Sequence, residues 1–155
     1  MRELIAKYRE KGFKLTPQRL AILNFLDGNT SHPTADDIYR EIKKNYPAVS
    51  FATVYNTLQA LRDRGKVAEI TIDFQKKHYD PDIRPHHHII CTECNKIADV
   101  FQDYSEALRL PYNIKGEFQS TGNHVNFYGI CKKCRNLSRY VSKRENKKRR
   151  TKLCA

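Results

Sequence analysis

Four cysteines in two closely spaced pairs constrain this chain more than any other feature of its sequence. Cys91 and Cys94 form one Cys-x-x-Cys pair, and Cys131 and Cys134 form another after the 36 residues from 95 to 130. A tetrahedral structural zinc ion takes four thiolates, and each pair offers two of them from one tight turn. Thiolates also favour zinc over harder cations. We therefore predict a structural Zn²⁺ site; disulfides and free core cysteines are the alternatives.

The charge of the chain is unevenly distributed along its 155 residues. The net charge is +12, and residues 138–155 alone hold eight basic side chains against one acidic side chain. This composition predicts a basic, disordered tail that attracts nucleic acid electrostatically, in which Cys154 is a free thiol. The N-terminal residues are charged, and no apolar run is long enough to cross a bilayer. We therefore expect a cytoplasmic protein that makes no contact with membranes.

Residues 1–82 are predicted to form a winged helix-turn-helix DNA-binding domain with a hinge. Hydroxyl side chains that can cap a helix recur through this region, and apolar residues at helical spacing follow them. The expected elements are helices that begin near residues 2, 17, 34 and 51, followed by strands over 67–72 and 77–79. Short helices followed by two alternating strands are typical of the winged layout.

The fourth of these helices carries the predicted DNA-reading side chains. Val54, Leu58 and Leu61 recur at helical spacing and are expected to face the core. The residues expected to face outward are Thr53, Tyr55, Asn56, Gln59 and Arg62. Short polar and amphipathic groups near a helix N-terminus suit contacts with base edges, thymine methyl groups and phosphates. A solvated amphipathic helix would show the same pattern, but its place before a predicted wing favours a recognition helix.

Residues 83–137 are predicted to form an α/β dimerisation domain stapled by the four-cysteine zinc site. The expected strands span 88–91, 97–101 and 124–131. Asp103 is expected to cap a helix through Leu110, which Pro111 ends. An exposed strand edge is a surface for self-association, so a homodimer is expected. The fold class is thus α+β, with an N-terminal winged helix-turn-helix domain and a C-terminal α/β domain.

A second set of possible metal ligands consists of imidazoles and carboxylates. Its members are His32, Asp80, His86, His88 and Asp99. Alternate residues of a strand share a face, so His86 and His88 should point together while His87 points away. Imidazoles mixed with carboxylates suit Mn²⁺, Fe²⁺ or Zn²⁺ in five- or six-coordination. Any single one could be an ordinary polar surface residue, as we expect for His78, but the group predicts a regulatory metal site.

Several motifs together closely resemble the ferric uptake regulator superfamily. They are Leu15-Thr-Pro-Gln-Arg19, His32-Pro-Thr-Ala-Asp-Asp-Ile-Tyr39, Ser50-Phe-Ala-Thr-Val-Tyr55, His86-x-His88-x-x-Cys91-x-x-Cys94 and Tyr128-Gly-Ile-Cys131-x-x-Cys134. They extend over about residues 1–137 and are far more specific in combination than singly. The resemblance implies a metal-dependent transcriptional repressor that binds a palindromic double-stranded DNA operator, not an enzyme with a small organic substrate.

Within the superfamily, the chain looks most like the peroxide-stress subfamily, PerR. That resemblance implies that the three histidines and two aspartates take Fe²⁺ or Mn²⁺. Iron-sensing members usually have glutamates at the positions of Asp80 and Asp99, and usually an arginine at that of Asn56. The resemblance further implies that peroxide oxidises a ligand histidine, here His32 or His86, and that the oxidised protein releases its DNA.

Two further groups of residues are expected to have functional roles. Lys14 and Arg19 are expected to contact phosphates or to enter the minor groove. By the same resemblance, His87, Glu106 and His124 form a possible additional metal site of the kind that some iron or zinc sensors carry.

Other functions fit parts of the sequence. An iron-responsive uptake repressor, or a zinc- or manganese-responsive regulator, would share the fold and most of the ligands. A metal-dependent hydrolase needs an open metal position and a general base, for which Glu93 or Glu106 is a candidate, but no hydrolase or deaminase motif accompanies them. A purely structural zinc-ribbon adaptor leaves the histidine cluster unexplained.

Overall fold

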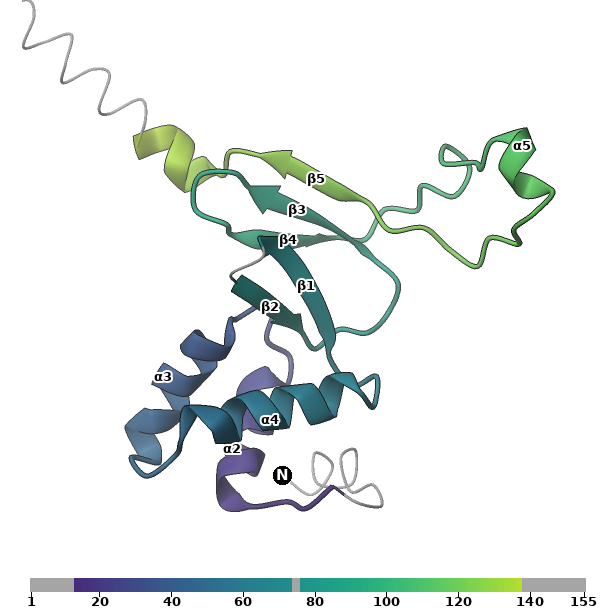
Figure 1. Ribbon diagram of the computed structural model, residues 1–155. Helices are drawn as coiled ribbons and strands as arrows, with labels where there is room; N and C mark the ends of the chain where they lie inside the picture. The colour runs from purple at the N-terminus through teal and green to yellow at the C-terminus, as the bar shows by residue number, and fades with distance from the viewer. Residues whose placement is uncertain (1–12, 74–75, 138–155) are drawn as a thin grey trace, which may run out of the picture. The chain divides into compact units, whose positions relative to one another are not determined.

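A computed structural model describes residues 13–73 and 76–137 of the chain. It contains two compact units, one that ends at Pro85 and one that begins at His86. Figure 1 labels their helices and strands. The predicted first helix and the basic tail with Cys154 lie outside the described residues. Within the described residues, no helix has the length and apolar character needed to cross a membrane.

The described helices of the first unit begin at hydroxyl caps. They are α2 (Pro17–Leu26), α3 (Ala35–Asn45) and α4 (Phe51–Arg62). The side chains of Thr16, Thr34 and Ser50 each accept a hydrogen bond from a backbone N–H of the first turn. Such bonds satisfy donors that the helix leaves unpaired. The predicted starts of these helices are therefore confirmed.

One face of α4 packs into the apolar core of the first unit. Val54, Leu58 and Leu61 are at most 1% exposed, which confirms the predicted buried stripe. The core also contains Ile22, Leu23, Leu26, Ile38, Ile42 and Val49. Thr57 is fully buried on the same face, which the apolar pattern did not predict. Its hydroxyl donates to the carbonyl of Thr53 at 2.6 Å, so its polar group is satisfied.

A two-stranded antiparallel sheet follows α4. Gly65 has a φ of +62°, which suits a glycine, and the chain then enters β1 (Ala68–Asp73) and β2 (Lys76–Asp80). The N–H of Tyr79 in β2 donates to the carbonyl of Pro33 at 3.0 Å, which ties the hairpin to the segment before α3. Helices followed by this hairpin form the predicted winged helix-turn-helix (Figure 1).

The second unit is built on a three-stranded sheet in the order β4-β3-β5. Its strands are β3 (His87–Cys91), β4 (Ile97–Val100) and β5 (Asn126–Gly129). The central strand β3 is antiparallel to β4 and parallel to β5. Because β3 contains both His88 and Cys91, this sheet arranges most of the predicted metal ligands.

The prediction of a helix from Asp103 to Leu110, between β4 and β5, is wrong. Residues 104–110 form only a single turn. The carboxylate of Asp103 accepts a hydrogen bond from the N–H of Ser105, which closes a turn instead of capping a helix. Pro111 in addition disfavours helical backbone at the residue before it. A short helix, α5 (Tyr112–Lys115), begins after this proline and projects away from the sheet (Figure 1).

The burial of α4 generates a prediction about stability. Leu58→Ala should lower the free energy of unfolding by about 2–5 kcal/mol, because it removes buried methyl groups and leaves a cavity. Denaturant unfolding followed by circular dichroism measures this loss. The exposed neighbour provides a matched control, since Gln59→Ala should change the free energy by less than about 0.5 kcal/mol. Equal losses in the two variants would contradict the assignment of Leu58 to the core.

Candidate metal centres

Parallel pairing of β3 with β5 brings the two cysteine pairs together. Cys91 is the last residue of β3 and lies opposite Gly129, the last residue of β5. The N–H of Thr92 donates to the carbonyl of Gly129 at 2.9 Å and extends this pairing. Cys131 follows two residues later. Both Cys-x-x-Cys turns therefore emerge at the same end of the sheet.

The geometry of the cysteine cluster fits zinc. Its four Sγ atoms lie within 4.8 Å of one another, and those of Cys94 and Cys131 are 3.8 Å apart. Four sulfurs at about 2.3 Å from a tetrahedral zinc ion would be about 3.8 Å apart. All four cysteines are free thiols, so the disulfide alternative is not observed for them. The predicted four-cysteine cluster is confirmed, and its donor set is that of a structural zinc site.

Crowding and hydrogen bonds shift the thiol pKa values in opposite directions. The N–H of Cys131 donates to Sγ of Cys91 at 3.3 Å, and this bond is the main reason that the pKa of Cys91 falls to about 6. Hydrogen bonds with Cys94 and then Cys131 raise the pKa of Cys134 to about 12. Four thiolates this close repel one another unless a cation neutralises them. A tetrathiolate at this position therefore requires a bound cation.

A second group of ligands lies at the other end of β3. His88 pairs with Asp99 of β4, and His86 immediately precedes β3. The Nε2 atoms of His86 and His88 lie 3.5 and 3.7 Å from Oδ1 of Asp99. Two donors at about 2.1 Å from one ion are about 3 to 4 Å apart at ordinary coordination angles. These three side chains therefore fit a single metal ion.

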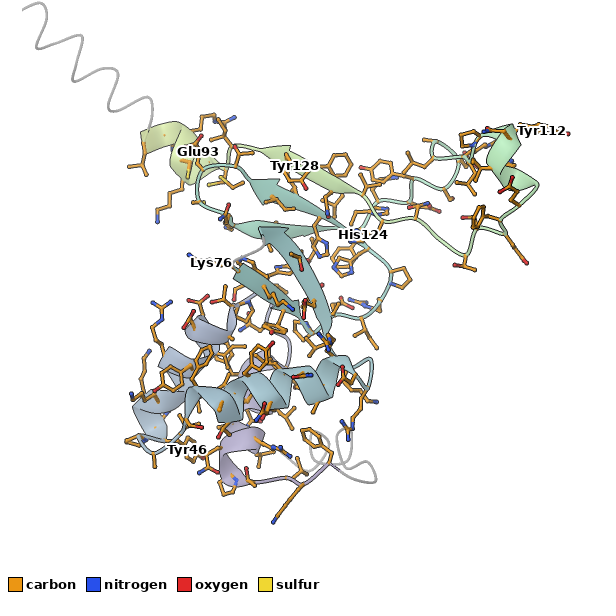
Figure 2. All side chains as sticks on the ribbon, in the orientation of Figure 1. Tyr46, Lys76, Glu93, Tyr112, His124 and Tyr128 are labelled. Atoms are coloured by element: carbon orange, nitrogen blue, oxygen red, sulfur yellow. The ribbon has the colours of Figure 1, made fainter. Side chains whose placement is uncertain are left out.

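His87 and His124 have different partners. Nδ1 of His87 accepts a hydrogen bond from the N–H of Val125 at 3.2 Å. Nδ1 of His88 lies 3.1 Å from Nε2 of His124, which Figure 2 labels. Burial lowers the pKa of His124, which favours its neutral, hydrogen-bond-accepting form. Glu106 is exposed, and the possible additional site is not among the metal-binding groups that the described residues form.

The first unit contains its own pair of possible ligands, His32 and Asp80. Nε2 of His32 lies 3.7 Å from Oδ2 of Asp80, and both side chains are buried. The other carboxylate oxygen, Oδ1, accepts a hydrogen bond from the N–H of Asp82 at 2.8 Å and so orients the carboxylate. His32 has a φ of +50°, a left-handed conformation that costs a non-glycine residue roughly 1–3 kcal/mol. Such strain concentrates at functional sites.

The predicted DNA-facing residues of α4 differ in how they are held. Those on its exposed surface are Tyr55, Asn56, Gln59 and Arg62. The hydroxyl of Thr53 lies 2.9 Å from that of the capping residue Ser50. Arg62 forms ion pairs with Asp63 and Glu69 at 2.9 and 3.2 Å, which neutralise part of its charge. The aromatic and amide side chains are therefore better presented for base contacts than the guanidinium is for a phosphate.

The other two predicted DNA contacts lie before and within α2. Lys14 is exposed. Arg19 is half-buried, and its Nη1 donates to the carbonyl of Lys14 at 3.0 Å. The guanidinium carbon lies 5.2 Å from the centre of the Phe13 ring, within the range of a cation–π contact. Arg19 thus stabilises the start of α2 in addition to any contact with DNA.

Comparisons with known proteins agree with this arrangement. The sequence model of the ferric uptake regulator family matches residues 10–128. The peroxide-responsive repressor PerR of Staphylococcus aureus is 38% identical over 135 residues, which cover 86% of this chain and 90% of that protein. The structure of the ferric uptake regulator from Francisella tularensis with iron matches this chain with 30% sequence identity and a TM-score of 0.69. The match covers 81% of this chain and 97% of that chain. The Campylobacter jejuni peroxide stress regulator is 35% identical, with a TM-score of 0.59 and coverages of 86% and 95%.

The cysteine cluster generates a prediction about metal content. Cys131→Ser should reduce bound zinc from about one ion per chain to a small fraction of that, because three thiolates bind zinc more weakly than four. Elemental analysis of the gel-filtered protein measures the zinc content. Cys154→Ser is the matched control and should keep its zinc, since Cys154 has no spaced cysteine partner. Full zinc occupancy in Cys131→Ser would show that the ion is held elsewhere.

Proposed function

The chain belongs to the ferric uptake regulator family, and we propose that it is a metal-dependent, DNA-binding transcriptional repressor that senses peroxide through oxidation of a ligand histidine. The observation that carries this proposal is that Nε2 of His86 and Nε2 of His88 lie 3.5 and 3.7 Å from the same carboxylate oxygen of Asp99. The Staphylococcus aureus and Campylobacter jejuni relatives, which are named as peroxide regulators, support it.

The regulatory ion, Fe²⁺ or Mn²⁺, takes ligands from both units in this proposal. His32 and Asp80 come from the first unit, and His86, His88 and Asp99 come from the second. Three imidazoles and two carboxylates suit these cations, whereas the thiolate cluster suits zinc. Within each unit the donor separations are 3.5 to 3.7 Å, which is compatible with coordination to one ion.

Shared ligands give metal binding a way to control DNA binding. An ion that needs donors from both units is fully coordinated only in a restricted range of their relative orientations. Binding therefore shifts the population towards those orientations, by as much as the ion's affinity differs between them. Because α4 belongs to the first unit, the presentation of its exposed face to DNA depends on the metal.

The identity of the two carboxylates supports peroxide sensing over the control of iron uptake. Asp80 and Asp99 are each one methylene shorter than the glutamates that iron-sensing members usually have. Bound ferrous iron would catalyse the reaction of its ligands with hydrogen peroxide. In the net two-electron oxidation, a C–H bond of the His32 or His86 ring is replaced by a C–O bond to one peroxide oxygen, and the other oxygen leaves as water with the displaced hydrogen. The oxidised ring is a poorer ligand, so the orientation that favours DNA binding is lost.

We propose that a homodimer binds a palindromic DNA duplex. Large apolar side chains of the second unit are exposed, which supports a second copy of the chain as their partner. They include Ile89, Phe101, Tyr128 and Ile130; Figure 2 labels Tyr128 on β5. Two-fold symmetry would present two copies of α4 to half-sites about 34 Å apart, one turn of the duplex, or a multiple of that distance.

Peroxide treatment tests the proposed function directly. The zinc-loaded chain, given Fe²⁺ without oxygen and then a small excess of hydrogen peroxide, should gain one oxygen atom on the peptide that holds His32 or His86. It should at the same time lose its affinity for DNA selected from a random pool. Mass spectrometry and gel-shift assays measure the two effects.

The Mn²⁺-loaded chain is the control for this experiment. It should bind the same DNA and remain unmodified, because Mn²⁺ does not readily reduce peroxide. A chain that stays unmodified with iron and still binds DNA would instead be an iron-responsive repressor, and the aspartates would not determine the signal. DNA binding that ignores both metals would exclude either kind of regulation.

The exposed tyrosine of α4 generates a prediction about specificity. Tyr55 is 42% exposed. Tyr55→Ala should weaken binding to the selected operator about 10- to 100-fold, since contacts with a base are worth about 1–3 kcal/mol, and should change non-specific binding much less. Tyr55→Phe retains the ring and should retain most of the specific affinity. Equal losses on both kinds of DNA, measured by fluorescence anisotropy, would contradict a base-reading role.

A further inference from the structure

His78 is not one of the ligands assigned above, yet its side chain contacts the backbone of one of them. Nδ1 of His78, in β2, lies 2.7 Å from the carbonyl oxygen of His32, 46 residues away in the sequence. A carbonyl oxygen can only accept, so Nδ1 carries the hydrogen and donates it. A half-buried residue expected to be an ordinary surface histidine thus makes a specific bond to a candidate ligand.

The bond is made to a residue whose backbone conformation is unfavourable. His32 holds a φ of +50°, and a non-glycine residue keeps such a conformation only where its surroundings impose it. Two contacts with β2 do so here: the bond from the His78 side chain, and the backbone bridge between Thr34 and His78, which includes the bond from the N–H of Tyr79 to the carbonyl of Pro33. The first is made by a side chain, so substitution can remove it while the backbone contacts stay.

The same strand also presents a carboxylate to the ring of His32. Alternate residues of a strand share a face, so His78 and Asp80 project from the same side of β2. His78 holds the carbonyl of His32, and Oδ2 of Asp80 lies 3.7 Å from its Nε2. β2 therefore holds the backbone of His32 through a hydrogen bond and places a carboxylate opposite its ring.

We infer that His78 is a positioning residue for the regulatory metal. It acts by holding His32 in its left-handed conformation. This inference rests on the proposed function, because that function assigns His32 and Asp80 to the metal. Removal of a group that hydrogen-bonds to a metal ligand, and so orients it, typically weakens metal binding by about 10- to 100-fold. His78 lowers the cost of ordering His32 when the ion binds.

The test uses two substitutions of different chemistry in the full zinc-loaded chain. His78→Phe keeps a ring of similar size but has no polar hydrogen to donate. His78→Asn can place an amide N–H close to the position of Nδ1. We expect His78→Phe to bind Mn²⁺ about 10- to 100-fold more weakly than the unsubstituted chain, and His78→Asn to recover most of that loss. Zinc content and the thermal unfolding midpoint should be unchanged in both.

A second readout needs no metal at the regulatory site. The Cα and Cβ chemical shifts of His32 report its backbone conformation, and they should move away from left-handed values in His78→Phe but not in His78→Asn. Unchanged shifts in His78→Phe would overturn the inference, as would equally weak Mn²⁺ binding by the two variants. If the unsubstituted chain binds neither Mn²⁺ nor, without oxygen, Fe²⁺, the proposed function fails, and the chemical shifts still decide whether His78 positions His32.

Discussion

The second unit depends on the parallel pairing of β3 with β5. Parallel strands cannot be joined by a tight hairpin and need a long crossover, usually one that contains a packed helix. Here the crossover contains only α5 as a described helix, four residues long and without a buried side chain. A zinc ion that joins the ends of both strands offsets the loop-closure entropy that such a crossover costs. The metal thus replaces packing that a longer helix would otherwise supply.

The short strand β3 also separates two kinds of metal chemistry. His88 and Cys91 are three residues apart, which corresponds to about 10 Å along a strand. Imidazole and carboxylate donors gather near His88, and thiolates gather near Cys91. Because soft and hard donors prefer different cations, the two ends of the strand suit two different ions, zinc at the thiolates and a harder cation at the imidazoles and carboxylate.

Local signals in the sequence predicted much of this structure. What they missed was in one case a competing local turn and in another a contact between residues far apart in the sequence. Caps such as Ser50 and the spacing of the cysteine pairs act over a few residues, so their consequences could be read directly. The cap signal at Asp103 was misleading, because its carboxylate closes a turn instead. The role of His78 depends on a bond to His32 across 46 residues, and no local pattern reports such a contact.

The ion pairs beside α4 affect how the protein's charge acts on DNA. Glu69 lies 3.2 Å from Arg62 and 2.9 Å from Lys77, so one carboxylate is shared by two cations. A DNA phosphate that approaches either cation competes with the carboxylate of Glu69. The cation then neutralises less of the phosphate charge, so fewer of the counterions condensed on the DNA are released. The net charge of +12 therefore overstates the electrostatic attraction near this helix. In the function proposed above, recognition by this helix relies more on contacts with bases, which depend less on ionic strength.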